Sequence, residues 1–271
     1  MVGQELVEIL LVREPSAEVV LADIKHGCDL REYNTCYNLC KGVDEIFHVA
    51  GIKGNPKMTE YRPLDFMLPM LQMDSNMIRA AIENNVPKFL YTSSIAVLYP
   101  DVDKYPAWAK KTGETLIEAA RVQYPENKFC VVRPTNIYGR YDNFNNPDAM
   151  VVTNLITKAI KSSTLEVWGT GGEMRDFINA KDVVLGMIKT MKAMPDKPIN
   201  LCTGVQHSIR TVVETIRANI GKELSITYTG QTVGSKNRPI EFNGEIINFE
   251  PTVQLEDGIK EAIKYAYETL S

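Results

Sequence analysis

Short β-rich runs alternate with amphipathic helical patterns over the first 135 residues, and this alternation restricts the fold more than any other feature of the sequence. Runs rich in β-branched and aromatic residues predict buried strands, whereas apolar residues three and four positions apart predict helices. A chain that alternates strands with helices folds as a parallel sheet with helices on both of its faces. The predicted strands lie at 17–24, 45–52, 88–94 and 128–139, and the predicted helices lie at 5–12, 76–85 and 107–124.

The character of the sequence changes after Gly139, where a polar and turn-rich segment begins. Further helix and strand patterns follow that segment, at 151–162, 165–178, 181–194, 197–204, 208–221 and 255–270. Some of these extend the sheet, and the others are insertions that build a second, smaller unit. We predict a dinucleotide-binding domain of residues 1–139 plus about 175–204, and a substrate-binding lobe of about 140–174 plus 205–271.

Composition excludes several classes of protein. The net charge is −4, without the basic stripe that a nucleic-acid-binding protein carries. No apolar run reaches the roughly 18 residues of a membrane span, and the amino terminus lacks the pattern of a signal peptide. The five cysteines are scattered and odd in number, and no second pair joins Cys36 and Cys40 to complete a zinc site. We therefore expect reduced cysteines, no metal, and a cytoplasmic protein.

Asp23 ends the first predicted strand, about 20 residues after Gly3. In dinucleotide-binding folds an acidic residue at this place binds the ribose diol, and its charge favours NAD over NADP because it repels a 2′-phosphate. The alternative is an aspartate that caps a helix or a loop. Of the glycine-rich turn that should precede it, only Gly3 is present, and the strand before that turn is missing from the sequence given. Either residues upstream of Met1 have been omitted, or the cofactor binds weakly.

Six blocks spread over nearly the whole chain carry a specific combination of motifs: MVGQELVEILL, DLRE, GVDEIFHVAG, FLYTSSIAV, RPTNIYG and LEVWGTGGEMRDFINAKDVV. Together they resemble the extended short-chain dehydrogenase/reductase family, which contains the nucleotide-sugar epimerases and dehydratases. The resemblance implies a Rossmann-like, doubly wound parallel sheet, here without its first strand, and a small C-terminal substrate lobe. It also implies NAD as the cofactor and a nucleotide sugar as the substrate.

The resemblance gives individual residues a role. In this family a tyrosine removes or returns a hydroxyl proton while hydride moves to or from the nicotinamide. A lysine lowers the pKa of that tyrosine and holds the ribose, and a serine completes the hydrogen-bond relay. These three catalytic roles fall on Tyr105, Lys110 and Ser94. The implied cofactor-binding residues are Gly3, Asp23, Asp29, Ala50, Lys110 and Pro134, and the implied substrate-binding residues are Ser94, Asn136 and Arg175.

The spacing in KYPAWAKKTGET departs from the family pattern, in which the tyrosine stands four residues before the lysine. Pro106 occupies that position, and Tyr105 stands five residues before Lys110. At about 100° per residue, five steps place Tyr105 some 140° around a helix from Lys110. Pro106 suits the first helical turn, so we expect Tyr105 at or before the helix cap. Tyr105 is thus a displaced candidate base, with a purely structural role as its alternative; a pairing with Lys111 fails as well.

Other candidates also have structural alternatives. Ser94 could satisfy backbone groups at a strand end, and Asn136 could shape a turn. Arg175 follows a glycine turn, where it is placed for a substrate phosphate, or it could pair with Asp176 or Asp182 on the surface.

Two further side chains are assigned to structure. We expect His48 to be a strand-end histidine whose hydrogen bonds are satisfied, and Trp168 to be a packing residue.

The sequence therefore predicts an NAD-dependent epimerase or dehydratase that acts on a nucleotide sugar by transient hydride transfer. RPTNIYGRYDNFNNPDAMVV looks most like bacterial surface-sugar epimerases. By analogy with the family, a homodimer would form through the helices at about 68–84 and 107–123. The main alternative is a catalytically impaired relative that binds a nucleotide sugar without turnover. A weaker alternative is a reductase of a non-sugar carbonyl, against which Arg175 argues.

Overall fold

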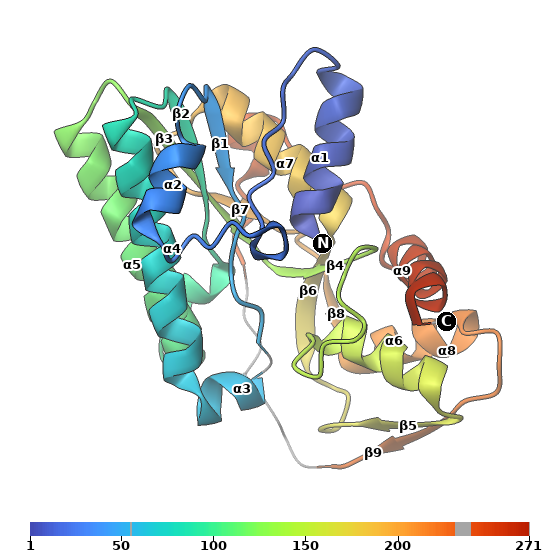
Figure 1. The fold of residues 1–271 in the computed structure, drawn as a ribbon. Helices are drawn as coiled ribbons and strands as arrows, with labels where there is room; N and C mark the ends of the chain where they lie inside the picture. The colour runs from blue at the N-terminus through green and yellow to red at the C-terminus, as the bar shows by residue number, and fades with distance from the viewer. Residues whose placement is uncertain (55, 231–239, 271) are drawn as a thin grey trace.

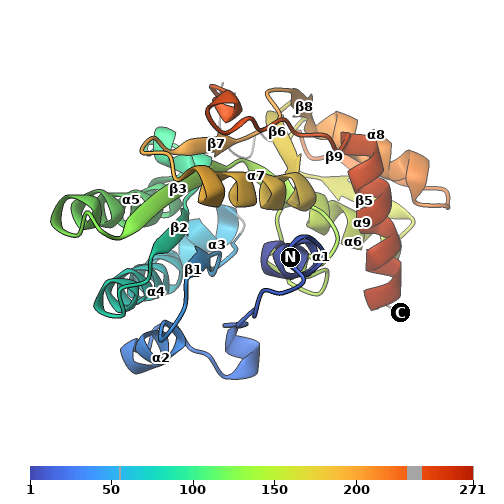
Figure 2. The same ribbon diagram turned by 90° about the horizontal axis from the view of Figure 1, so that it is seen from above.

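Four strands form a parallel sheet in the order β1-β2-β3-β7, as the alternation of strands and helices predicts. The computed structural model describes residues 1–54, 56–230 and 240–270. The four strands are β1 (Glu45–His48), β2 (Lys88–Thr92), β3 (Lys128–Pro134) and β7 (Ile199–Leu201). Helices cover both faces of this sheet (Figures 1 and 2). The prediction of a Rossmann-like α/β fold is confirmed.

Alternating side chains on the central strands explain why both faces are covered. On β2 and β3, Phe89, Tyr91 and Phe129 belong to one apolar core, and Leu90 and Cys130 belong to another. The first core lies under α2 (Tyr33–Leu39), α4 (Pro63–Glu83) and α5 (Lys104–Gln123). The second lies under α7 (Ala180–Ala193), with α1 (Val2–Arg13) beside it. Strands buried on both faces read as continuous apolar runs, which is how these two appear in the sequence.

The strand predicted at 17–24 is wrong. Residues 14–23 form no helix or strand, and the short helix η1 (Ile24–His26) follows them. Val20, Leu21 and Ile24 are 59%, 51% and 63% exposed. Among the described residues β1 pairs with β2 alone, so the segment has no neighbouring strand with which to exchange backbone hydrogen bonds. Strand propensity without such a partner does not make a strand.

The second half of the chain builds two smaller sheets. One contains β4 (Asn136–Tyr138), β6 (Met174–Asn179) and β8 (Gln206–Ser208), and the other contains β5 (Thr164–Val167) and β9 (Ser225–Tyr228). Their apolar core includes side chains of α6 (Val151–Lys161), α8 (Ile209–Asn219) and α9 (Leu255–Leu270). The remaining short helices are α3 (Pro56–Tyr61), η2 (Ile95–Leu98) and η3 (Gly244–Ile247). Within the predicted lobe, residues 231–239 and 271 lie outside the described residues.

The helix boundaries follow local chemistry. The Ser208 hydroxyl accepts a hydrogen bond from the Thr211 backbone N–H at 3.0 Å, and Gly221 adopts a positive φ of 73° just past the end of α8. Helices α4 and α5 begin 13 and three residues earlier than the predicted starts at 76 and 107.

Candidate active site

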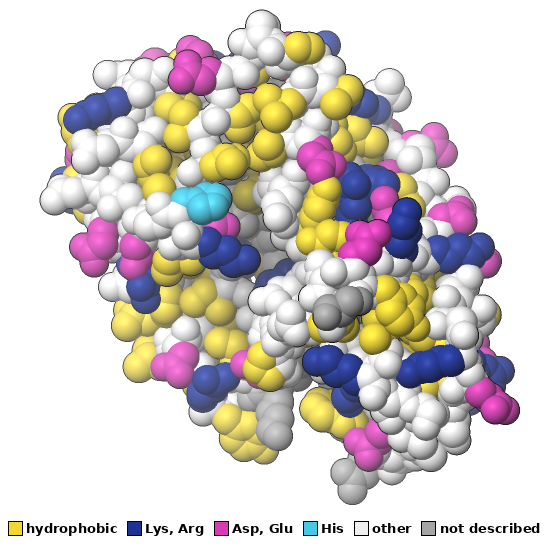
Figure 3. Space-filling model, turned by 45° about the vertical axis from the view of Figure 1, so that its right-hand side comes forward, with side chains coloured by type: hydrophobic (Ala, Val, Ile, Leu, Met, Phe, Trp, Pro, Cys, Tyr) yellow, Lys and Arg dark blue, Asp and Glu magenta, His cyan; other side chains and the backbone are white. Residues whose placement is uncertain are grey.

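A cleft opens at the carboxyl edge of the parallel sheet. Strands β1, β2 and β3 run in the same direction, so their ends and the loops that follow meet along this edge. The cleft has a volume of about 3780 Å³ and extends onto the second half of the chain. Figure 3 shows a hollow near the centre of one face, with Lys and Arg side chains along part of its edge. Ligands of open α/β sheets bind outside the carboxyl ends of the strands, so this cleft is the candidate site.

The structure brings all of the predicted site residues to this one cleft. They come from both halves of the chain and from positions more than 170 residues apart. The residues are Gly3, Asp23, Asp29, Ala50, Ser94, Tyr105, Lys110, Pro134, Asn136 and Arg175.

Lys110 lies on the cleft lining, above a buried polar cluster. Its side chain is 13% exposed, and its Nζ is 3.8 Å from Asp74 Oδ2 and 4.9 Å from the centre of the Tyr91 ring. Asp74 Oδ2 also accepts a hydrogen bond from the Tyr91 hydroxyl at 2.6 Å. Asp74 Oδ1 is 2.8 Å from His48 Nε2. His48 is therefore a strand-end histidine with a satisfied ring nitrogen, as expected.

Burial and charge act in opposite directions on this cluster. Burial alone would raise the pKa of Asp74, but the charge of Lys110 and the hydrogen bonds from His48 and Tyr91 outweigh it and lower that pKa. Burial lowers the pKa of Lys110, and the charges of Asp74 and Glu114 oppose that effect. Burial and the neighbouring Asp74 raise the pKa of Tyr91 far above its ordinary value. Tyr91 is consequently a hydrogen-bond donor to Asp74 and not a base.

A second buried cluster fixes the strand ends beneath the cleft. Glu114 on α5 is 1% exposed, and it accepts hydrogen bonds from Arg133 at 2.7 and 2.6 Å and from the Ser93 hydroxyl at 2.6 Å. Lys111 lies 3.7 Å from the same carboxylate. Ser93 directly follows β2, Arg133 belongs to β3 and Glu114 belongs to α5. This cluster therefore sets where Ser94 lies relative to the helix that carries Lys110.

Ser94 performs the structural role that was considered for it. Its Oγ accepts a hydrogen bond from the Ala96 backbone N–H at 3.2 Å and so caps η2. A serine hydroxyl can accept and donate at the same time, so this cap leaves its O–H available to a ligand in the cleft.

Tyr105 is inside a helix, and the expectation that it would lie at or before the cap is wrong. Helix α5 begins at Lys104, so Tyr105 and Pro106 both occupy its first turn. The backbone N–H groups of a first helical turn have no hydrogen-bond partner within the helix. Proline, which lacks an N–H, therefore costs no helical hydrogen bond at this place. The Lys104 ammonium is 5.5 Å from the centre of the Tyr105 ring. The nearest cation to this ring is therefore supplied by Lys104, because Lys110 stacks over Tyr91.

The amino terminus of α1 faces the cleft at the end of β1. A Cβ added to Gly3 would be 3.7 Å from Val49 Cγ2, so the helix approaches the strand closely, although packing there does not demand glycine. The first N–H groups of a helix have no internal partner and attract an anion. Ala50 follows on the same loop, and Pro134 ends β3 across the cleft.

The two acidic cofactor candidates each have a local partner. The Asp23 carboxylate accepts a hydrogen bond from the Lys25 backbone N–H at 2.8 Å and caps η1, which is the alternative that the sequence left open. Hydrogen bonds from the Arg31 side chain, and then from its backbone N–H, lower the pKa of Asp29 to about 2. Both carboxylates still lie on the cleft lining.

The substrate candidates come from the second half of the chain. The Asn136 side chain donates to the Asp176 backbone carbonyl at 2.8 Å, and because Asn136 begins β4 and Asp176 lies in β6, this bond joins two neighbouring strands and forms no turn. Arg175 donates to the Met174 carbonyl at 2.7 Å. The carboxylate of Asp176 instead accepts hydrogen bonds from Thr135 and from the backbone at 203 and 204.

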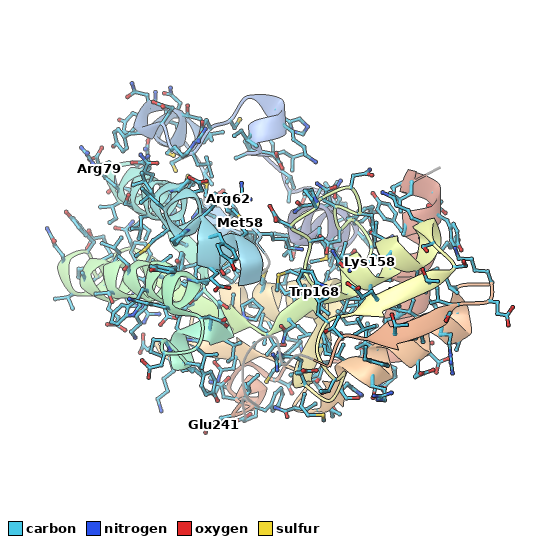
Figure 4. All side chains as sticks on the ribbon, turned by 90° about the horizontal axis from the view of Figure 1, so that it is seen from below. Met58, Arg62, Arg79, Lys158, Trp168 and Glu241 are labelled. Carbon is cyan, nitrogen blue, oxygen red and sulfur yellow. The ribbon has the colours of Figure 1, made fainter. Side chains whose placement is uncertain are left out.

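Trp168 does more than fill space, so the prediction of a packing residue needs correction. Its side chain is 44% exposed, and the Lys158 ammonium lies 5.3 Å from its ring centre. Both residues line the cleft, and Figure 4 shows them on one side of the molecule's central gap, with Met58 of α3 and Arg62, which follows α3, on the other. Trp168 directly precedes the glycine turn 169–172, which keeps it outside the core.

Two ion pairs join the halves of the chain across the edge of the cleft. Lys53 follows β1 and pairs with Asp142 at 2.7 Å, and Arg62 follows α3 and pairs with Asp148 at 2.9 Å. Both acidic residues belong to the polar segment after Gly139. The turn-rich segment is therefore held over the site by charge and by a hydrogen bond from Thr153 to Asp142.

Asp74, Tyr91 and the Glu114–Arg133 pair are the site residues that sequence reasoning missed. A signal for Asp74 exists, because it lies on the apolar stripe of α4 between buried Met70 and Met77. A carboxylate on such a stripe must have polar partners in the core.

Residues of the cleft lining fit different parts of a nicotinamide dinucleotide. Among the described residues the Lys110 ammonium makes no hydrogen bond, so its donors could bind ribose hydroxyls in the cleft that Ala50 and Pro134 also line. The amino terminus of α1 could bind the pyrophosphate, with Gly3 as its single glycine.

Comparisons with known proteins agree with this fold. Residues 1–202 match the model of the NAD dependent epimerase/dehydratase family. The chain is 28% identical over 230 residues to GDP-L-fucose synthase of Escherichia coli (strain K12), covering 73% of this chain and 69% of that protein. It is 26% identical over 253 residues to GDP-L-colitose synthase of Yersinia pseudotuberculosis, covering 81% and 80%. A GDP-6-OMe-4-keto-L-xylo-heptose reductase from C. jejuni has the same fold, with a TM-score of 0.89, 21% identity, and coverage of 100% of this chain and 95% of that one.

In the ranges 1–54, 56–230 and 240–270, none of the helices combines the length and the apolar character needed to cross a membrane.

Proposed function

The chain belongs to the NAD-dependent epimerase/dehydratase family, and from that premise we propose that it is an epimerase or dehydratase that acts on a nucleotide sugar by transient hydride transfer. The observation that carries the proposal is that Ser94, Tyr105 and Lys110 line the same cleft as Arg175, which comes from the other half of the chain. The relatives named above, which are synthases and a reductase of GDP-sugars, support a nucleotide sugar as the substrate.

Each residue has a role that its position supports. Lys110 holds the cofactor ribose through N–H groups that no described residue engages. Ser94 donates a hydrogen bond to the reacting sugar oxygen, and Tyr105 removes and returns its proton. Arg175 pairs with the substrate phosphate. The chemistry that NAD supplies when bound is the reversible acceptance of hydride from the sugar carbon.

We propose NAD rather than NADP as the cofactor. We also propose that one half of the chain binds the cofactor and the other binds the substrate. The carboxylate of Asp23 on the cleft lining repels a 2′-phosphate, which supports NAD. A separate apolar core drawn from residues between 138 and 266 supports a substrate lobe, with residues 1–139 and about 175–204 as the dinucleotide-binding domain. Five free cysteines, four of them buried, support a cytoplasmic location.

Lys110→Ala should weaken NADH binding about 10-fold, and Ser94→Ala should slow turnover about 10-fold, because each removes one hydrogen-bonding group of about 1.5 kcal/mol. Calorimetric titration with NADH measures the binding affinity of Lys110→Ala, and parallel titration with NADPH tests the choice of cofactor. Steady-state rates with GDP-sugars and UDP-sugars measure the turnover of Ser94→Ala. Lys158→Ala, which removes a cleft lysine on the other half of the chain, is the control for NADH binding. Unchanged values in both variants would remove these two residues from the mechanism.

We also propose a homodimer formed through α4 and α5, which pack side by side on the outside of the sheet (Figure 1). Leu68 on α4 and Trp108 on α5 are apolar and 47% and 51% exposed. Trp108→Glu should convert the dimer to a monomer, because it places a charge in an apolar interface. Light scattering after gel filtration measures the mass. Val12→Glu, at an apolar residue of α1 that is 80% exposed, is the control. A wild-type monomer would contradict the proposal.

A second candidate function is a relative that binds nucleotide sugars without turnover. Two observations favour it: Pro106 stands four residues before Lys110, and residues 14–23 form no strand beside β1. Tight binding of a nucleotide sugar in the absence of NAD, with no product at high enzyme concentration, would support this candidate over the enzyme. Turnover that depends on NAD would eliminate it.

A further inference from the structure

Asp74 stands directly behind the lysine of the cleft, in a place where the fold does not need a charge. Its side chain is 1% exposed and is outside the cleft lining, whereas Lys110 belongs to that lining. It interrupts the buried stripe of α4 between Met70 and Met77. Burying a carboxylate is unfavourable unless charge and hydrogen bonds compensate. The side chains that offset the burial of the Asp74 carboxylate indicate its role.

Two of these partners fix the position of the Asp74 carboxylate. His48 at the end of β1 lies 2.8 Å from Oδ1, and the Tyr91 hydroxyl on β2 donates to Oδ2 at 2.6 Å. A Cβ at Gly113 would be 2.1 Å from the Tyr91 oxygen, so α5 leaves room for this contact only because it has glycine there. The carboxylate is thus held from two strands and cannot turn away from Lys110.

The contact between Asp74 and Lys110 is electrostatic and uses none of the lysine's donors. The Nζ to Oδ2 distance of 3.8 Å is too long for a hydrogen bond but short for two opposite charges. One turn earlier on α5 the chain has Pro106, which offers no polar group to direct the ammonium. The direction of the Lys110 head group therefore depends on Asp74 and on the face of the Tyr91 ring.

We propose that Asp74 is a positioning residue that holds the Lys110 ammonium, charged and with its N–H groups directed into the cleft, for the bound nucleotide. The inference rests on the proposed function, in which Lys110 binds the cofactor ribose. Asp74 itself touches neither cofactor nor substrate. Its effect is to keep a nearly buried lysine protonated at the pH at which the protein works, against the desolvation that favours the neutral amine.

Several other ionisable groups lie around Lys110, and they bear on the test. Glu114 of α5 adds a second negative charge, although Arg133 of β3 and Lys111 engage that carboxylate. His48 of β1 faces the opposite oxygen of Asp74. Asp74 is the one acidic side chain among the described residues that forms an ion pair with Lys110 within 4 Å.

The decisive variant is Asp74→Asn, in which the amide keeps the shape and removes the charge. Competitive labelling with trace acetic anhydride, read by mass spectrometry on the Lys110 peptide from pH 6 to 11, measures the pKa of this lysine without any cofactor. We expect the pKa of Lys110 to fall by about one unit or more, as loss of an opposite charge at this range does. Asp65→Asn, at an exposed aspartate on the same helix, should leave it unchanged.

Tyr91→Phe distinguishes an effect of the Asp74 charge on Lys110 from an effect of reduced fold stability. It removes a hydrogen bond to Asp74 and keeps the carboxylate, so it should lower thermal stability with a pKa of Lys110 close to that of the wild type. If Asp74→Asn does not fold, Asp74→Ser provides the same loss of charge in a smaller side chain. An unchanged Lys110 pKa in a folded neutral variant overturns the proposal, as does an equal fall in Tyr91→Phe.

The affinity for NADH tests whether the charge of Lys110 matters for cofactor binding. In Asp74→Asn, the affinity for NADH should decline at a lower pH than in the wild type, because Lys110 without its opposite charge loses its proton more readily. Failure of the wild type to bind NADH at any pH would defeat the proposed function, while the labelling result would still decide whether Asp74 keeps Lys110 charged.

Discussion

Arg133→Met should lower the free energy of unfolding by about 3–5 kcal/mol, because it leaves the Glu114 carboxylate buried without its cation. The Glu114 side chain is 1% exposed, and Arg133 holds both of its oxygens at 2.7 and 2.6 Å. The hydrogen bond from Ser93 remains, but a hydroxyl does not neutralise the charge. Lys111 at 3.7 Å is 44% exposed, so solvent weakens its compensation. Urea unfolding followed by circular dichroism measures the change.

Two matched variants make this result specific. Arg79→Met breaks the exposed pair of Arg79 with Glu83, whose side chains are 66% and 40% exposed, and should cost about 0.5 kcal/mol or less. The double variant Arg133→Met with Glu114→Met removes the charge together with its partner, and should be more stable than Arg133→Met alone. A loss below about 1 kcal/mol for Arg133→Met, in the range of an ordinary surface pair, would contradict the argument.

The parts of the fold that the sequence predicts are those decided by local patterns. The apolar runs of β2 and β3 depend on residues within one element, and both strands lie where the pattern indicates, whereas α4 begins 13 residues before its predicted start. The segment 17–24 has an equally strong pattern but forms no strand, because pairing depends on a neighbour that the pattern cannot supply. The predicted start of α5 is also wrong, because Pro106 marks a first turn without showing at which residue that turn begins.

The sequence predicts those residues of the candidate site that belong to sequence motifs. It does not predict those whose role depends on contacts between distant helices and strands. Ser94, Lys110 and Arg175 lie in recognisable blocks, and the structure brings them to one cleft. Asp74 belongs to no recognisable motif, and its role depends on its contact with Lys110, which is 36 residues away in the sequence. A polar residue on an apolar stripe was the available signal.

Tyr105→Phe should reduce turnover by about 100-fold or more, because it removes the hydroxyl proposed to exchange a proton with the sugar and leaves the ring in place. Tyr105 lies on the cleft lining in the first turn of α5, with the Lys104 ammonium 5.5 Å from its ring centre. The spacing to Lys110 does not place the two side chains on one helix face, so the effect should fall on the rate constant for turnover and not on NADH affinity. Single-turnover rates and calorimetry measure the two quantities separately.

Tyr61→Phe is the control, since Tyr61 also lines the cleft, is 72% exposed, and has no proposed role in proton transfer. Its turnover should equal that of the wild type. If an active wild type loses nothing in Tyr105→Phe, proton transfer must come from another group on the cleft lining. If the wild type itself has no activity but binds a nucleotide sugar, the position of Pro106 before Lys110 has removed the base, and the chain is the non-catalytic relative.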